Sequence, residues 1–591
     1  MTPETLRDRD TLDVVRISIP EFTEQNTCED FFRELDQIST SAWSLRLEKT
    51  LPQRLQQISQ GLENQEMFPE APILEQLLNW EKWKEIVYAQ KMGALSSLKD
   101  FSPSAWSELM DVYCQIQKER LEIAHQWASQ LKESELPWAG YGLLTMIEIS
   151  LASLDFNEVY LQYLRYGALG EDSTKADNRR GREYFLKRKK NKTNSYLPQI
   201  EAYPQLNAIT QQYIEEAVLI QNRVKDGLLD ESYLFLAETL VAAASAYGSR
   251  EKNWHKIDQI WMALRKASAR LMASDCPVTF IAETTIGSRA EIEPGVRVGM
   301  KTEKTKDLEN RLREYGLKDL VTETIHRDYS EYLKLAEIPE IYCNLQTFTF
   351  GTNLESVTRA EQEMFFIVLH ANDITARFEN DRPTLKKLFP GLLARFEALS
   401  PEIQQDVVTL VLLLHEYGHT LLSNYINEIE GRLGYSELSS IVDEVKADCC
   451  GVLLLSELNN LTPELRKLIF DLWFATTTVE GSLDQSPHAD EFGASYFYSF
   501  CEEIYQIFAH DAIKETDEDE YSINSNLSIG VIISKARELL FYYSKSKYKH
   551  SFFESLGSEA KKTYHDYRVR KLIDRIRKNA FQDKEGLFSF C

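Results

Sequence analysis

The segment from Ser400 to Leu455 constrains the fold more than any other part of this chain. Ser400 followed by Pro401 is typical of a helix N-cap and the first position of the helix. The apolar run VVTLVLLL comes next, and no glycine or proline inside it would break the helix. These features predict a largely buried helix that continues to about Ile426.

The sequence HEYGH lies on this helix and predicts a metal site. His415 and His419 are four residues apart, so both imidazoles project from one helix face and can share one ion. Glu416 lies beside that face and suits a general base that acts on water at the metal. A solvated helix face without a metal is the alternative for any pair of this kind.

A second helix supplies candidates for the third ligand that a catalytic zinc needs in addition to an open position. This helix, which we expect Ser440 to cap, reads SIVDEVKADCCGVLLL. We interpret Glu444 as the third ligand, and Asp448, four residues later, as the acceptor for the free ring N–H of a histidine. Ala447 and Gly451 are small enough to allow close approach of the two helices. The competing acids are Asp443, Glu437 and Glu430.

Composition limits the class of protein and its partners. The chain has 591 residues, which is more than one core usually accommodates, and a formal net charge of -25. So acidic a surface argues against nucleic acid or an anionic membrane as the main partner and favours a positively charged substrate, such as a peptide with a free amino terminus. The first residues, MTPETLRDRDTLD, lack the apolar core of a secretory signal, and no stretch approaches the length of a membrane span.

Cysteine usage indicates the compartment. The eight cysteines are scattered along the chain, and the adjacent pair Cys449 and Cys450 lies on the helix that carries the acids. Such spacing does not form a disulfide framework. We therefore expect a cytoplasmic protein; its oligomeric state does not follow from the sequence.

The pattern of apolar residues predicts an α+β fold that is predominantly α-helical. Residues 1–200 form a helical N-terminal region, residues 201–356 a mixed α/β lobe, and residues 357–591 a helical, zinc-binding catalytic lobe. Strands are expected at 277–300 and 345–353, where short β-branched segments are interrupted by glycine. We expect a cleft between the helical lobe and the smaller β-containing lobe.

The segment DEVKADCCG resembles the second zinc motif of the dipeptidyl peptidase III family of zinc metallopeptidases. That motif consists of two acids, any residue, Arg, Ala, an acid, Cys, any residue and Gly, and Lys446 takes the place of its arginine. The second acid of the opening pair is the zinc ligand of the family, and it corresponds to Glu444. The chain departs from the family in having HExxH where the family usually has HExxxH, and in the shorter interval between His419 and Glu444.

The resemblance also implies substrate-binding residues. GTNLES resembles a cleft segment of the family and gives Asn353 the role of holding the substrate backbone, whereas ETTIGSRAEIE gives Glu283 the role of binding the amino terminus. His488, in SPHADEFGASYF, is the implied stabiliser of the oxyanion. The alternatives are a solvent-facing strand acid for Glu283, a turn residue for Asn353 and a surface histidine at a helix start for His488.

The activity that the resemblance implies is that of a zinc-dependent exopeptidase that hydrolyses peptides from the N-terminus and releases dipeptides. One alternative is a gluzincin of other specificity, either an endopeptidase or an enzyme that acts on a non-peptide amide. Another is a non-catalytic, zinc-containing, peptidase-like binding protein. A fourth protein ligand in the open position would favour the binding protein.

Overall fold

The computed structural model describes residues 19–26, 30–31, 33–35, 118, 120–136, 138–153, 206–247, 278–283, 295–300, 302–316, 340–344, 351–353, 367–420, 437–484, 491–516, 520–543 and 550–583. Helices make up most of these residues, in agreement with the predicted, predominantly α-helical class. Among the described helices, none is both long and apolar enough to cross a lipid bilayer.

The described helices fall into two stretches of the chain. The helices that precede strand β5 (Ile367–His370) in the chain are α6 (Tyr141–Ala152), α10 (Leu206–Lys225), α11 (Tyr233–Tyr247) and α13 (Glu303–Glu314). Those after it are α15 (Ala371–Leu388), α16 (Pro390–Glu397), α17 (Pro401–Thr420), α19 (Glu437–Glu457), α20 (Pro463–Asp484), α21 (Glu491–Ala509), α22 (Ser525–Tyr543), α23 (His550–Thr563) and α24 (Tyr567–Asp583).

The two helices that carry the metal motifs begin at different kinds of residue. At α17 the hydroxyl of Ser400 accepts a hydrogen bond from the backbone N–H of Ile403 at 3.4 Å, and Pro401 is the first helical residue, as expected. Helix α19 begins at Glu437, so Ser440 lies inside the helix and the expectation that it caps the helix is wrong.

A five-stranded sheet has the order β1-β2-β3-β5-β4. Its strands are β1 (Val278–Glu283), β2 (Gly295–Met300), β3 (Glu340–Asn344), β4 (Gly351–Asn353) and β5 (Ile367–His370). Only β3 and β5 run parallel, and every other neighbouring pair is antiparallel. Strands β1, β2 and β4 fall in the predicted segments. Strand β5 falls where only helices were expected, because periodicity does not distinguish so short an apolar run from a helix.

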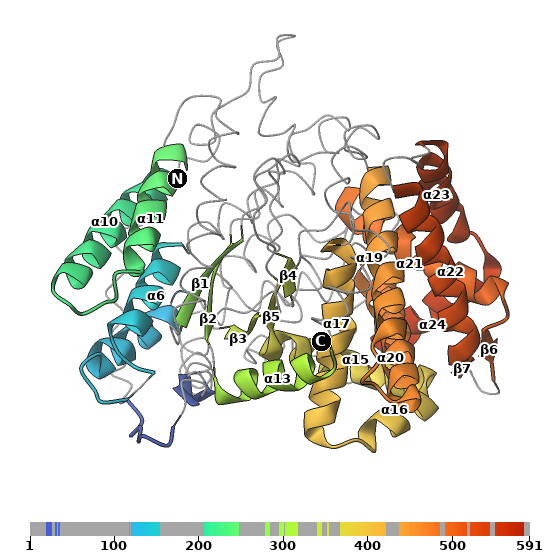
Figure 1. Cartoon of the computed structure of the whole chain (residues 1–591), viewed down its shortest axis with the longest axis horizontal. Coiled ribbons are helices and arrows are strands. Elements are labelled where there is room, and N and C mark those ends of the chain that lie inside the picture. The colour runs from blue at the N-terminus through green and yellow to red at the C-terminus, as the bar shows by residue number, and fades with distance from the viewer. Residues whose placement is uncertain are drawn as a thin grey trace, which may run out of the picture.

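Buried apolar side chains of the described residues form two separate clusters. One joins residues from 31 to 244, including α6, α10 and α11, and the other joins residues from 308 to 576, including α13 and the helices that follow β5. The sheet lies between them (Figure 1), with α6 against β1 and β2 and with α17 against β4 and β5. The boundaries at 200 and 356, and the cleft, stay predictions.

Candidate metal centre

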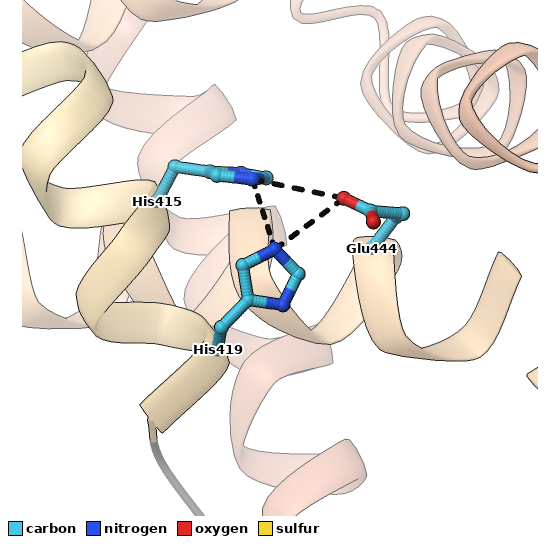
Figure 2. A group of neighbouring side chains, drawn as sticks. All are labelled: His415, His419 and Glu444. Carbon is cyan, nitrogen blue, oxygen red and sulfur yellow. Dashed lines mark hydrogen bonds and ion pairs between the residues drawn. The ribbon is translucent and has the colours of Figure 1, made fainter. Parts of the chain in front are cut away.

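His415 and His419 lie on one face of α17, in the last turns of its described part. Other faces of this helix are anchored in the core by Leu410, Leu413 and Tyr417, each at most 1% exposed. The two Nε2 atoms are 3.1 Å apart, and both rings point toward the carboxyl group of Glu444 on α19 (Figure 2). The structure thus brings together the three side chains that the sequence singled out as ligands.

The backbones of α17 and α19 approach each other closely behind these side chains. A Cβ atom placed on Gly418 would lie 1.9 Å from the carbonyl oxygen of Ala447. A Cβ atom on Gly451 would lie 2.8 Å from the carbonyl oxygen of Leu414. The absence of side chains at these two glycines therefore sets the helix separation at which Glu444 reaches the histidines.

Glu444 presents a single buried oxygen to both rings. Its Oε2 is 3.6 Å from Nε2 of His415 and 3.5 Å from Nε2 of His419. Among the described residues this oxygen has no hydrogen-bond partner. A buried carboxylate oxygen without a partner costs free energy unless a cation meets it, so the arrangement has the character of a cation site.

The distances between the three ligand atoms fit a tetrahedral zinc ion. Zinc bonds to nitrogen and carboxylate oxygen are about 2.0–2.2 Å long, which places neighbouring ligand atoms of a tetrahedral site about 3.3–3.6 Å apart. The observed separations are 3.1, 3.5 and 3.6 Å. Within the described part of the chain only His415, His419 and Glu444 gather in this way. Three protein ligands leave one coordination position for water or substrate, as in catalytic zinc sites.

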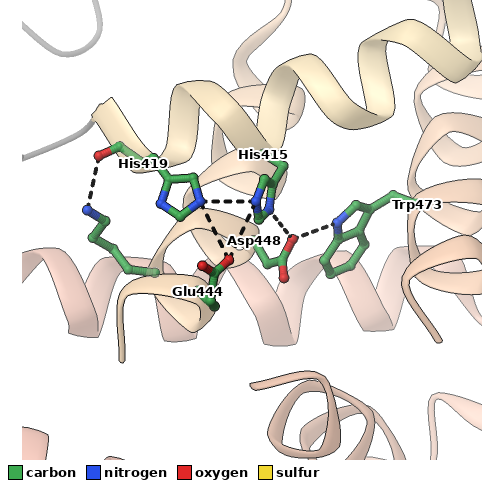
Figure 3. A network of polar contacts seen from close by, with 6 residues as sticks. His415, His419, Glu444, Asp448 and Trp473 are labelled. Carbon is green, nitrogen blue, oxygen red and sulfur yellow. Dashed lines mark hydrogen bonds and ion pairs between the residues drawn. The ribbon is translucent and has the colours of Figure 1, made fainter. Parts of the chain in front are cut away.

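Asp448 fixes the orientation of the His415 ring (Figure 3). Its Oδ1 lies 2.8 Å from Nδ1 of His415 and accepts a second hydrogen bond, from Nε1 of Trp473, at 3.1 Å. A carboxylate only accepts, so Nδ1 carries the ring hydrogen and Nε2 keeps its lone pair for a metal.

Burial and charge oppose each other in this pair. Burial raises the pKa of Asp448, but the charge and hydrogen bond of His415, with the hydrogen bonds of Trp473 and Glu503, leave it below its usual value. Burial lowers the pKa of His415, but the charge and hydrogen bond of Asp448, together with the charge of Glu444, leave the pKa of His415 above its usual value. Asp448 is therefore ionised at neutral pH.

Lys446 links the two helices at the end of the described part of α17. Its side chain is fully buried, and its Nζ donates a hydrogen bond to the carbonyl oxygen of His419 at 3.1 Å. The last carbonyl groups of a helix lack intrahelical donors, and a basic side chain satisfies them well. Lys446 therefore helps to fix the backbone that carries the second ligand.

Glu416 lies on α17 directly after His415, where the motif places the general base. Its side chain is buried, with 8% of its surface exposed. Its role as the general base stays a prediction.

The side chains of three other predicted site residues are outside the part of the chain that the structure describes. His488 lies outside the described residues, and so do the side chains of Glu283 and Asn353. In the backbone, Glu283 ends β1 and Asn353 ends β4, the two edge strands of the sheet. Four strand spacings of about 4.8 Å separate these edges by roughly 19 Å. Of these two edge strands, β4 packs against α17, and the substrate-binding roles of Glu283 and Asn353 stay predictions.

The sequence analysis missed two side chains that contact Asp448. Trp473 comes from α20 and Glu503 from α21, and both are buried. A signal exists for Glu503, because the segment FCEEIYQIF places two acids inside an otherwise apolar helix. No local signal marks Trp473, which resembles any other core aromatic residue.

Comparisons with known proteins found similarity to solved structures but not to known sequences. No protein-family profile matches the chain, and no curated protein matches its sequence. The solved structure of dipeptidyl-peptidase III from Corallococcus sp. strain EGB is similar over 74% of this chain and 78% of its own, with a TM-score of 0.48 and 15% sequence identity. The functional proposal therefore depends on the motifs of this chain and on the geometry of its metal centre.

Proposed function

We propose that this chain is a zinc-dependent hydrolase of peptides, with zinc held by His415, His419 and Glu444. One observation carries the proposal: three ligand atoms from two helices lie 3.1–3.6 Å apart, and the buried oxygen of Glu444 lacks a hydrogen bond. Two imidazoles and one carboxylate form a donor set that hydrolytic zinc sites use.

The residues around the ligands have separate roles in hydrolysis. A zinc ion held by these three side chains would supply Lewis acidity toward a scissile carbonyl and toward water. Glu416 accepts a proton from the attacking water and returns it to the leaving amine. Asp448 keeps His415 in its Nδ1–H tautomer. We assign the remaining contact to the oxyanion to His488, on the resemblance of its segment.

We assign the specificity to peptides cleaved near the amino terminus, with release of dipeptides. The resemblance of DEVKADCCG to the family motif supports this assignment, and the net charge of -25 favours a substrate with a free ammonium group. Asn353 is the better candidate for contact with that end of the substrate, because β4 lies next to α17. Glu283 belongs to the opposite edge of the sheet.

The first test separates metal binding from turnover. The purified chain should contain about one zinc per molecule, and Glu416→Gln should keep the metal while losing activity by roughly 10²–10⁴-fold. His419→Ala should lose both. Elemental analysis and peptidase assays on the same preparations measure these outcomes. A Glu416→Gln variant that retains turnover would exclude Glu416 as the base, and a wild-type chain that binds no zinc would refute the proposal.

The second test identifies the class of peptidase. Mass spectrometry of a peptide mixture should show dipeptides released from free amino termini and no release from N-acetylated copies of the same peptides. Glu416→Gln serves as the control for contaminating peptidases. Internal cleavage would instead favour an endopeptidase, and zinc binding without any cleavage would favour a peptidase-like binding protein.

A further inference from the structure

A buried acid behind the metal centre has no part in the chemistry described so far. Glu503 comes from α21, which packs against α19, and its side chain is 3% exposed. Its carboxyl group is hydrogen-bonded to Asp448, the residue that orients His415. The side chain of Asp448 therefore lies between Glu503 and His415, one of the proposed metal ligands.

A hydrogen bond between two carboxyl groups requires a proton, because an ionised carboxylate has no donor. Asp448 already accepts from Nδ1 of His415 and Nε1 of Trp473 through one oxygen. Two donors converging on Asp448 favour its ionised form. The shared proton therefore belongs to Glu503, which acts as the donor.

The charges around Glu503 agree with a neutral acid. The surrounding titratable groups are Asp448, Glu444 and Cys449 on α19 and Glu502 on α21. Lys535 of α22 pairs with Glu502, at 3.5 Å from Nζ to Oε1. Burial, followed by the charge of Asp448, raises the pKa of Glu503 well above its usual value.

We propose that Glu503 is a positioning residue of the zinc site, a neutral acid whose donated hydrogen bond holds Asp448 in place against His415. The inference rests on the proposed zinc function and extends it by one residue. A neutral donor is suited to this place because it fixes the geometry of Asp448 without adding a cation. A lysine or arginine in this position would form an ion pair with Asp448 and weaken the interaction of Asp448 with His415.

Zinc affinity, measured by competition with a chromophoric chelator, tests the role without reference to turnover. Glu503→Gln supplies an amide donor of nearly the same shape, and its affinity should stay within about threefold of wild type. Glu503→Met has similar length but no donor, and its affinity should fall about tenfold. Glu502→Gln is the matched control, since Glu502 is equally buried and faces Lys535; its zinc affinity should not change.

The outcomes separate this inference from the zinc proposal itself. Wild-type zinc affinity in Glu503→Met would overturn the positioning role and leave the metal centre intact. Equal losses in Glu503→Gln and Glu503→Met would also overturn it, because a donor would then not restore binding. Should Glu503→Met fail to fold, Glu503→Leu offers the same comparison. A wild-type chain without zinc affinity would refute the proposed function instead.

Discussion

At Asp448, three parts of the chain meet around one carboxylate. It accepts hydrogen bonds from His415, which precedes it by 33 residues, and from Trp473, which follows by 25. The i to i+4 spacing of the histidines and of Glu444 and Asp448 was visible in the sequence, because spacing within a helix determines the face. The contact with Trp473 was not visible, because it depends on how α20 packs.

Asp448→Asn should weaken zinc binding by about 10–100-fold, because a neutral amide is a poorer acceptor for Nδ1 of His415. Zinc competition assays measure the change. Asp471→Asn is the control: Asp471 is 1% exposed and is paired with Arg395 at 2.6 Å, so it also loses a buried acid but makes no contact with Asp448 that the structure shows. An equal loss of zinc affinity in both variants would show that general destabilisation, not orientation of the ring, is responsible.

At the scale of the helices, the contact between α17 and α19 determines whether the centre exists. Gly418 and Gly451 bring the two backbones close enough for Glu444 to meet both rings. The sequence analysis identified Ala447 and Gly451 as small residues, but it did not identify Gly418. A glycine inside HEYGH has no local role that would distinguish it from any other variable position.

Gly418→Ala should separate the two helices, because its Cβ would lie 1.9 Å from a backbone oxygen of Ala447. We expect a loss of about 3 kcal/mol or more in the free energy of unfolding, together with a large loss of zinc affinity. Denaturant titration and zinc competition measure the two effects.

Gly530→Ala is the matched control on α22, where an added Cβ meets nothing within 4 Å. It should leave zinc affinity unchanged and stabilise the chain by about 0.5–1 kcal/mol, because alanine is a better helix former than glycine. Zinc affinity equal to wild type in Gly418→Ala would contradict the close-packing explanation.

At the scale of the whole molecule, the apolar cluster of residues from 31 to 244 also contains acidic side chains whose pKa values are shifted. In the cluster of α6, α10 and α11, Glu148 is paired with Arg223. Glu216 lies nearby, and its Oε2 has no hydrogen-bond partner among the described residues. Burial, with the neighbouring charge of Glu148, raises the pKa of Glu216 to about 7. The unfolded chain would titrate this group near 4.5.

This shift makes stability depend on pH. Between pH 4.5 and 7 the folded chain binds more protons at Glu216 than the unfolded chain, so stability falls as pH rises through this range. Glu216→Gln should therefore be more stable than wild type at pH 8, by about 1–2 kcal/mol after allowance for partial exposure, and nearly equal to it at pH 5.

Denaturant titrations at pH 5 and pH 8 measure this difference. Glu215→Gln is the control, since Glu215 is the adjacent residue on α10 but its side chain is exposed. A gain from Glu216→Gln that is the same at both pH values would contradict an ionisation effect.

The group of candidate metal ligands, the start of α17 and the predominantly helical class followed from sequence, because helix periodicity and capping are local properties. The mixed sheet with its edges at β1 and β4, and the contacts of Asp448 with Trp473 and Glu503, appear only after folding. They join residues far apart in the chain, and their partners are chosen by packing rather than by spacing. The sequence therefore specified which side chains can hold an ion, whereas the packed helices specify how those side chains are held.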